Sequence, residues 1–493
     1  MARKPMFYNA ILLTAVNLAL RFVSTSFQVF ISARLGAEGV GLLQLVLSVG
    51  SFAMTAGMAG IRTATMYLTA EALGRHHRER IPHILGCCLV YSLICGGTVA
   101  ALLYGFAPMI AETWITRPEI LPAIRFFAVF LPIACVSGCL CGYFTAANRI
   151  STLAAVEIGE QAASMTLTVI LLCFWAGSDP TRAICAVIIG SGLGSIVTAS
   201  SLGILHQLEH LPNGEKRPIA RKLLSTAVPL GLADDLKIGI NTLESLMVPR
   251  RLALYPGTGS ALGSFGMVSG MVFPILMFPA CILYALAELL IPELARCAAA
   301  GSRLRIRYLT TRSLRIALLY GCLFGGLMHL LAGWLCDSLY RSSEAGDMLR
   351  LYTWLTPMLY CDAITDAINK GLGQQKTAVR YNILTAVLDV IGLYILLPRY
   401  GMTGYFISFT FSHAVNFLLS LGLLMRISGV TIPFQVPLLS LCAAILGVII
   451  GAFAAPIPLR ILGFLDIYGS LLVLFRVVSR EDLTWFRGLV TKK

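Results

Sequence analysis

The stretch ILGCCLVYSLICGGTVAALLYGFAPMIA, from Ile84 to Ala111, decides the fold class of this 493-residue chain. It carries no charge, and a run of roughly 18 or more such residues predicts a helix that spans a bilayer. Leu153–Ala176 and Leu438–Ala455 are similar runs with almost no charge. The strands of an outer-membrane barrel would instead alternate apolar and polar residues in segments of about ten. The sequence therefore predicts an all-α membrane protein.

The overall composition agrees with this class. Hydrophobic residues make up 57% of the chain and charged residues 13%, whereas soluble domains carry about a quarter charged residues. The mean hydropathy is +0.81. The net charge of +14 comes from basic residues scattered over short loops, where they face anionic lipid. We therefore expect the lipid bilayer as a partner and no nucleic acid.

The apolar runs predict about fourteen transmembrane helices. The first run follows Met1–Pro5 and is too long for the apolar part of a signal peptide, so we expect it to be retained. Pro456 and Pro458 separate the last two runs. The predicted spans are residues 6–33, 39–69, 84–111, 121–147, 152–176, 181–206, 223–249, 263–292, 313–336, 349–372, 377–398, 402–425, 434–455 and 458–476.

The basic residues predict the orientation of these spans. With the N-terminus in the cytoplasm, 25 of the 38 Lys and Arg residues fall on inside segments and 10 on outside segments. Because cytoplasmic loops carry an excess of Lys and Arg, this asymmetry predicts that both termini are cytoplasmic. We expect a multi-pass protein of the bacterial cytoplasmic (inner) membrane.

The sequence also resembles itself at a spacing of about 222–225 residues. RFFAVFLP at Arg125–Pro132 corresponds to RLYTWLTP at Arg350–Pro357, and Glu71 corresponds to Glu293. The offset covers an even number of helices, so the two repeats share one orientation, as in transporters that bind substrate between their repeats. The repeat predicts an N-lobe at 1–210 with spans 1–6, a C-lobe at 218–430 with spans 7–12, and a C-terminal pair of spans with a cytoplasmic tail at 431–493.

Three basic residues remain inside spans: Arg21, Arg62 and Lys237. A cation at bilayer depth costs roughly 2.5–3.5 kcal/mol on insertion scales and usually faces a cavity. At 100° per residue, Asn17, Arg21 and Gln28 share one face of the first span, and Arg62 continues a polar stripe on the second. One interpretation is that the arginines pair with Glu157 and Glu160 of the fifth span as structural ion pairs.

The other interpretation is that the arginines line an aqueous cavity and hold an anionic headgroup, because guanidinium matches phosphate with two parallel hydrogen bonds. Asn17, Gln28 and Lys237 complete this candidate substrate site.

Four carboxylates are candidates for ion coupling. Asp234 and Asp235 follow Pro229 and Gly231, which we expect to weaken the seventh span, and interrupted helices often carry ion sites. Asp362 and Asp366 share a face of the tenth span. These acids either bind a coupling H⁺ or Na⁺ or neutralise neighbours such as Lys237. A membrane potential is the other expected driving force.

Motifs of nucleotide hydrolysis and of hydrolases are missing from the sequence: it has no G-x-x-x-x-G-K-[ST], H-E-x-x-H or G-x-S-x-G. Most of its fourteen cysteines lie in apolar runs, as Cys135, Cys139 and Cys141 do, without His or carboxylate at metal-ligand spacing. We therefore expect a non-enzyme without metal or cofactor, whose cysteines pack between helices.

Several stretches resemble the stage V sporulation protein B group, in the polysaccharide transporter branch of the multidrug/oligosaccharidyl-lipid/polysaccharide (MOP, MATE-like) flippase superfamily. Glu244 stands where this group is expected to have Asp. The stretches that carry the resemblance are RLGAEGVGLLQLVLSVGSF (Arg34–Phe52), AGMAGIRTATMYLTAEALGR (Ala56–Arg75), LMVPRRL (Leu246–Leu252), FPILMFPACILYALAELLIPELA (Phe273–Ala295) and INKGLGQQKTAVRYN (Ile368–Asn382).

The resemblance implies two lobes around a V-shaped cavity and flipping of an undecaprenyl-linked saccharide, a peptidoglycan or polysaccharide precursor, with spore cortex synthesis as one role. In related lipid II flippases, arginines on the first two helices line the cavity, and Arg21 and Arg62 fall on those helices here. Two alternatives stay open: a MATE-type multidrug/cation antiporter, whose cavity should be acidic, and a non-transporting membrane scaffold.

Overall fold

The computed structural model describes residues 3–74, 77–177, 179–208, 219–257, 259–430, 435–453, 456–475 and 477, and these residues contain helices and turns but no strand. They form two compact units. The N-terminal unit comprises residues 1–27 and 34–266, and the C-terminal unit comprises residues 28–33 and 267–493. The predicted cytoplasmic tail after residue 477 lies outside the described residues.

Helix α1 (Arg3–Met58) contains the first predicted span and most of the second. Its 56 residues would extend about 84 Å at 1.5 Å per residue, and the apolar layer of a bilayer is only about 30 Å thick. The helix is kinked at Gly36, whose φ of 69° and ψ of 176° are not helical. A second break follows at Ala59 and Gly60, with φ of 42° and 73°, before α2 (Ile61–Gly74) begins.

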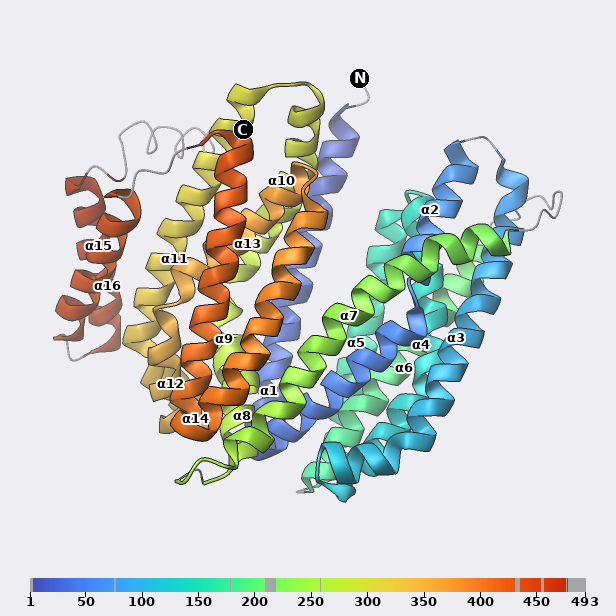
Figure 1. Ribbon diagram of the computed structural model, residues 1–493, viewed down its shortest axis with the longest axis horizontal. Helices are drawn as coiled ribbons and strands as arrows, with labels where there is room; N and C mark the ends of the chain where they lie inside the picture. Colours follow the sequence, from blue (N-terminus) through green and yellow to red (C-terminus); the bar gives the residue numbers. More distant parts are fainter. Residues whose placement is uncertain are drawn as a thin grey trace. The chain divides into compact units, whose positions relative to one another are not determined.

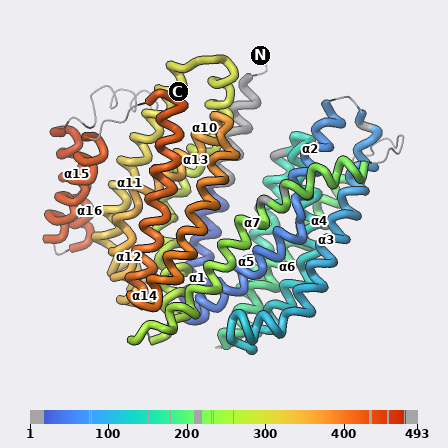
Figure 2. The backbone as a smooth tube through the Cα atoms, in the orientation of Figure 1, coloured from blue at the N-terminus to red at the C-terminus, as the bar shows by residue number. Residues whose placement is uncertain are grey.

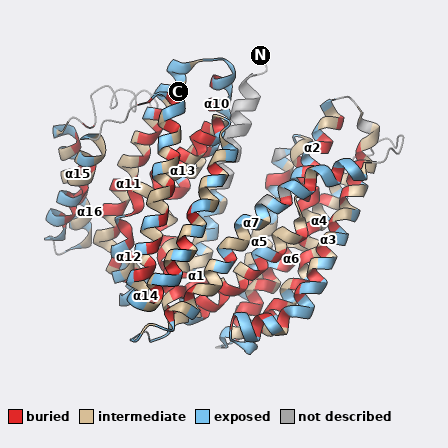
Figure 3. Ribbon diagram, in the orientation of Figure 1, coloured by how far each residue is buried: buried red, intermediate tan, exposed pale blue. Residues whose placement is uncertain are grey.

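Four more helices build the body of the N-terminal unit: α3 (Ile81–Met109), α4 (Leu121–Ala146), α5 (Ile150–Leu171) and α6 (Pro180–Gln207). Short π-helices at Ile110–Trp114 and Leu172–Ala176 extend α3 and α5. Helix α3 packs against α4, α5 against α6, and α4 against α6, as Figures 1 and 2 show. Buried positions gather where these helices meet, and exposed positions lie on their outer faces (Figure 3).

The core of this unit explains the abundance of cysteine. Cys88 and Cys139 are fully buried between α3 and α4, in one cluster with Ile61, Leu85 and Phe144. All fourteen cysteines of the chain are free thiols, and most of them are buried. They therefore act as small apolar side chains in helix packing.

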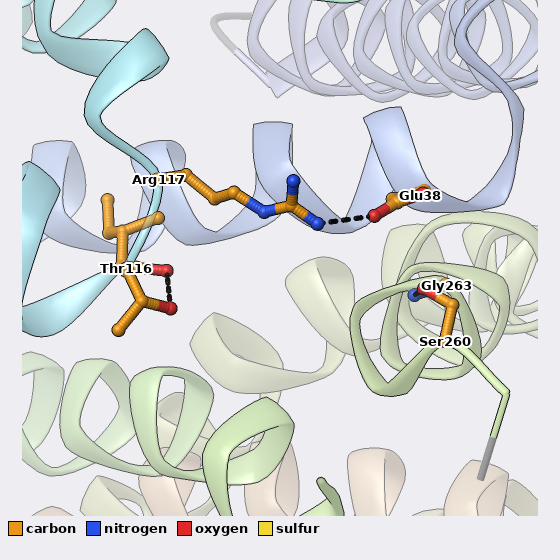
Figure 4. Close-up of polar contacts among 6 residues, drawn as sticks. Glu38, Thr116, Arg117, Ser260 and Gly263 are labelled. Atoms are coloured by element: carbon orange, nitrogen blue, oxygen red, sulfur yellow. Dashed lines mark hydrogen bonds and ion pairs between the residues drawn. The ribbon is translucent and has the colours of Figure 1, made fainter.

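An ion pair joins the segment after α3 to α1. Arg117, beyond the end of α3, contacts the Glu38 carboxylate at 2.7 Å, close to the Gly36 kink (Figure 4). The same view shows Ser260, whose hydroxyl accepts a hydrogen bond of 3.0 Å from the Gly263 amide in α8 (Ala261–Met267).

We expect Arg117→Ala to lower the free energy of unfolding by less than about 1 kcal/mol, because exposed ion pairs contribute about 0–1 kcal/mol. Both side chains are about half exposed. Thermal unfolding of the purified protein in detergent measures the change. A loss of several kcal/mol would show that this pair holds the kink.

Helix α7 (Ala220–Leu252) runs antiparallel to the second span within the N-terminal unit. At one end, the Thr242 hydroxyl donates a hydrogen bond of 3.0 Å to the Ser48 carbonyl oxygen. At the other, the Lys222 ammonium pairs with the Glu71 carboxylate at 2.5 Å. Contacts thus group residues 220–266 with the N-terminal unit, whereas the sequence repeat counts them with the second lobe. The lobe boundaries drawn from the repeat, 1–210, 218–430 and 431–493, stay predictions.

The expected weakness of α7 near Pro229 and Gly231 is not seen, because the helix is continuous there. The break lies instead in the second predicted span, which packs against α7, at Ala59 and Gly60. Gly231 packs so closely on this break that a Cβ atom in its place would lie 2.7 Å from the Ala59 carbonyl carbon. The glycine therefore allows close contact between a continuous helix and a broken one.

A bent segment crosses the boundary between the two units at residues 266 and 267. Helices Ala261–Met277 and α10 (Ala280–Ala299) meet at 64°; the first of these includes the π-helix Val268–Val272 and α9 (Phe273–Met277). Helix α14 has 54 residues and is kinked at Gly401, with φ of 58°, so it contains two predicted spans. The remaining helices of the C-terminal unit are α11 (Arg303–Tyr340), α12 (Ser343–Thr353), α13 (Thr356–Gly371), α14 (Gln375–Ser428), α15 (Gln435–Ala452) and α16 (Ile457–Leu474).

Helices α15 and α16 form a hairpin that packs on α11, and they lie side by side in Figure 1. Phe464 of α16 is fully buried and stacks on Tyr468 with 5.6 Å between ring centroids. The Tyr468 hydroxyl donates a hydrogen bond of 2.9 Å to the Leu319 carbonyl oxygen in α11. The thirteenth and fourteenth predicted spans are therefore helices, α15 and α16.

The described helices confirm a fold of about fourteen spans. Nine helices among the described residues are long and apolar enough to cross a membrane, and the bent segment makes up to ten. Two of the nine, Leu18–Gly74 and Gln375–Ser428, contain two spans each because of their kinks. Helix α7 and the pair α12–α13 supply the remaining two.

Candidate functional site

The predicted substrate residues lie on three helices, α1, α2 and α7. Arg21 on α1, Arg62 on α2 and Lys237 on α7 are all exposed within the protein. Gln28 is half-buried on α1 and belongs to the C-terminal unit. The side chain of Asn17 lies outside the described residues. Exposed cations on helices that cross a membrane face either water in a cavity or polar lipid headgroups, because burial of a cation in hydrocarbon is costly.

A polar stripe on α5 contacts both arginine-bearing helices. The Gln161 amide donates hydrogen bonds to the Leu20 carbonyl oxygen, at 3.4 Å, and to the Ser24 hydroxyl. These two residues flank Arg21 on α1. Gln161 therefore holds the middle of the first span against α5, close to the arginine.

The second arginine interacts with the same stripe. The Arg62 guanidinium and the Glu157 carboxylate interact electrostatically, and both charges also act on Cys141 of α4. One turn along α5, the Glu160 carboxylate accepts a hydrogen bond of 2.5 Å from the Thr198 hydroxyl of α6. Helices α1, α2 and α5 thus bring two arginines, two carboxylates and an amide into one region of the N-terminal unit.

This set of groups has a defined chemistry. Guanidinium binds phosphate oxygens with two parallel hydrogen bonds, whereas carboxylate and amide oxygens accept hydrogen bonds from hydroxyl groups. A ligand that carries both phosphate and sugar would use both kinds of group. The sequence indicated the arginines by their depth, but it offered Glu157 and Glu160 only as structural partners.

The two acids on α7 differ in environment. Asp234 is exposed, whereas Asp235 is half-buried, and its Oδ1 atom is buried without a hydrogen-bond partner among the residues that the structure describes. Asp235 interacts electrostatically with Tyr91 of α3. Lys237 is exposed on the same helix.

The predicted acids on α13 are both engaged. The Asn416 amide on α14 donates to the Asp362 carboxylate at 3.1 and 3.3 Å, and the Thr385 hydroxyl lies 3.5 Å from the Asn416 side-chain oxygen. Asp366 forms an ion pair of 2.6 Å with Lys370, one turn away on α13. Asp362 therefore belongs to a hydrogen-bonded group within the C-terminal unit, and Asp366 is neutralised locally.

One buried acid was missed by the sequence reasoning. Asp389 of α14 is 6% exposed and accepts a hydrogen bond of 2.6 Å from the Ser408 hydroxyl. A second hydroxyl, that of Ser412, also hydrogen-bonds to it. The signal was present in the sequence, because Asp389 is the single acid in the apolar run 377–398. Such a residue is a candidate for ion binding on the same grounds as Asp362.

A cavity of about 620 Å³ lies within the C-terminal unit, among α11, α13, α14 and α15. Its walls are mainly apolar, with Leu318, Met358, Phe417 and Leu421 among them, and Arg315 supplies a charge. A cavity of this kind accepts hydrocarbon.

Comparison with known proteins confirms the resemblance found in the sequence. The family model of MatE matches residues 14–175. The chain is 22% identical to stage V sporulation protein B of Bacillus subtilis over 508 aligned residues, which cover 98% of each chain. It is 20% identical to sporulation protein YkvU of the same organism over 385 aligned residues, which cover 74% of this chain and 82% of that protein.

Solved structures share its fold. An inward-facing multidrug resistance MATE family transporter of the MOP superfamily superposes with a TM-score of 0.70 at 15% identity, over 84% of this chain and 98% of that chain. The lipid II flippase MurJ, in an inward closed conformation, gives a TM-score of 0.67 at 14% identity, over 94% and 99%. The chain is therefore a multi-pass membrane protein with the fold of MOP-superfamily transporters, similar along almost its whole length to stage V sporulation protein B.

Proposed function

We propose that this protein is an alternating-access flippase that moves an undecaprenyl-linked saccharide, a peptidoglycan or polysaccharide precursor, across the bacterial cytoplasmic membrane. The observation that carries the proposal is the position of Arg21 and Arg62. Both are exposed on membrane-spanning helices, and both lie beside the polar stripe of α5. The arginines bind the diphosphate, and Glu157, Glu160 and Gln161 accept or donate hydrogen bonds to the sugars.

The remaining predicted residues have roles in this proposal. Lys237, Asn17 and Gln28 add polar contacts to the headgroup. Asp234, Asp235 and Asp362 are the acids that couple transport to H⁺ or Na⁺, whereas Asp366 forms an ion pair with Lys370. Both termini are cytoplasmic in this scheme, and the similarity to a stage V sporulation protein supports a role in spore cortex synthesis.

Reconstitution tests the function directly. Liposomes that contain the protein and a fluorescent lipid-linked oligosaccharide are treated with a membrane-impermeant quencher, with and without an imposed voltage, pH gradient or Na⁺ gradient. We expect the protected inner-leaflet fraction to become accessible only in protein-containing vesicles. Transport of cationic drugs in place of lipid would support the MATE-type antiporter instead. Movement of neither, by a correctly folded protein, would favour the scaffold.

A further inference from the structure

A row of titratable side chains begins in the turn before α3 and continues along one face of that helix at intervals of four residues: Glu79, His83, Cys87 and Tyr91. Residues four apart lie one above the other on a helix. The Cys87 sulfur lies 3.9 Å from His83 Nε2, and Tyr91 is hydrogen-bonded to Cys95, one turn farther. The row thus extends from the loop before α3 toward the middle of the membrane-spanning helix.

This row forms one wall of a cavity of about 680 Å³ within the N-terminal unit. The opposite wall is the first part of α7, with Ala220, Leu223 and Leu224. One water molecule occupies about 30 Å³ in the liquid, so the cavity has room for roughly 20. The rest of the lining is apolar, and the row gives this cavity hydrogen-bond partners at regular intervals, as a chain of water molecules requires.

The inner end of the row lies at the break in the second span. The Tyr91 hydroxyl donates a hydrogen bond of 3.3 Å to the Ala59 carbonyl oxygen, at the break where α7 packs through Gly231. One turn beyond Gly231 on α7, Asp235 has a buried carboxylate oxygen without a hydrogen-bond partner in the described part of the chain. Tyr91 and Asp235 interact electrostatically.

The described interactions of Asp235 include no cation. On α7 its neighbour Asp234 acts on it, and on α3 it interacts with Tyr91, which is hydrogen-bonded to Cys95. Arg62 on α2 acts on Glu157 and Cys141 instead. At the loop end, Lys222 pairs with Glu71, and His77 with Glu79.

We propose that the cavity between α3 and α7 is a water-filled route by which a proton reaches Asp235 from the loop end of α3. His83 takes up the proton from bulk water, water molecules beside Cys87 carry it inward, and the Tyr91 hydroxyl passes it to the Asp235 carboxylate, which becomes neutral. A proton fits this site better than Na⁺, because the groups that interact with Asp235 are one neighbouring carboxylate and one phenol rather than a full shell of oxygens. The inference deepens the proposed ion coupling, but proton binding itself needs no lipid substrate.

Cysteine modification tests whether the cavity holds water. The native chain is treated with a charged, membrane-impermeant methanethiosulfonate, and modified residues are located by tandem mass spectrometry. We expect Cys87, which lines the cavity, to react at least about tenfold faster than the adjacent Cys88, which is buried, because only an accessible thiolate reacts. Gly86→Phe should protect Cys87, since Gly86 lines the cavity with open space beside it. Modification of Cys87 only by lipid-soluble reagents would show a lipid-filled groove and overturn the proposal.

Proton uptake tests the destination, in the absence of any lipid-linked saccharide. After a pH jump, infrared difference spectra follow the carboxylic acid signal of the purified protein. We expect Asp235→Asn to remove this signal. His83→Gln and Tyr91→Phe should slow its appearance at least about tenfold with an unchanged final amplitude, because a positioned proton-transfer group contributes about 10²–10⁴-fold to rate. His77→Gln, which lies before α3 and outside the cavity lining, is the matched control and should keep the wild-type rate.

Two outcomes would refute the route: an unchanged signal in Asp235→Asn, or wild-type rates in both His83→Gln and Tyr91→Phe. Neither depends on lipid transport. If the protein moves lipid without this proton uptake, the proposed function stands and the proton route is wrong. If it takes up the proton without moving lipid, the route stands and the proposed function is wrong.

Discussion

Replacing Arg62 by alanine is expected to reduce translocation of a lipid-linked saccharide at least about 30-fold. Removal of one partner from a desolvated, hydrogen-bonded charge pair costs about 2–5 kcal/mol, and 2 kcal/mol corresponds to roughly 30-fold. The translocation rate of Arg62→Lys should lie between those of Arg62→Ala and the wild type, because lysine keeps the charge but cannot form two parallel hydrogen bonds to phosphate. The measurement is the initial rate of translocation in liposomes that contain equal amounts of each variant.

Two controls separate this effect from a general loss of protein. Arg117→Ala removes an arginine from the same unit, where its partner is the exposed Glu38, and should leave the rate unchanged. Thermal unfolding of Arg62→Ala should stay close to that of the wild type. Wild-type translocation in both Arg21→Ala and Arg62→Ala would remove the physical basis of the proposed substrate.

Exchange of two charges distinguishes substrate binding from a structural ion pair. Arg62 and Glu157 interact electrostatically, so Arg62→Glu combined with Glu157→Arg preserves their mutual attraction. If the arginine only held α2 against α5, the double variant would recover both stability and transport. Relative to the single variants Arg62→Glu and Glu157→Arg, we expect the double variant to recover stability but not transport. Its guanidinium projects from α5 instead of α2 and therefore does not reach the position of the phosphate.

The spans could be predicted because each is an apolar run bounded by charges or proline. Gly36 and Gly401 fall in the predicted gaps at 34–38 and 399–401, where Arg34 and Arg399 interrupt the runs. The break at Ala59 and Gly60 lies inside a predicted span, and glycine is common in membrane helices, so the composition gave no sign of it. The packing of α7 within the N-terminal unit could not be predicted either, because a sequence repeat indicates duplication but does not show which helices are in contact.

The candidate site was predictable in part for similar reasons. Arg21, Arg62 and Lys237 were found because a cation in an apolar run is costly wherever it lies. The same test applied to anions finds Asp389, which the sequence reasoning passed over. The neutralisation of Asp366 by Lys370 also follows from their spacing of four on a helix. What no spacing reveals is the hydrogen bonds between helices, such as those of Gln161 with α1, because they depend on which helix faces which.

Replacing Phe464 by alanine is expected to lower the free energy of unfolding by about 3–5 kcal/mol, the usual loss for a fully buried phenylalanine. Its ring is 0% exposed and fills the space above two glycines. A Cβ atom added at Gly326 of α11 would lie 2.4 Å from the ring, and one at Gly447 of α15 would lie 3.0 Å from it. This side chain therefore joins both helices of the C-terminal hairpin to α11, and without it we expect the hairpin to open first.

Hydrogen exchange followed by mass spectrometry measures that opening, with α3 and α4 as the internal reference. Phe453→Ala is the matched control, because the same residue type in the same hairpin is 86% exposed there, and it should change stability by at most about 0.5 kcal/mol. Gly326→Ala should destabilise the wild type through its clash with the ring, yet cost little once Phe464 is alanine, so the two changes should be strongly non-additive. Additive effects would show that α11 and α16 do not interlock through this ring, and that the hairpin is held by its other contacts.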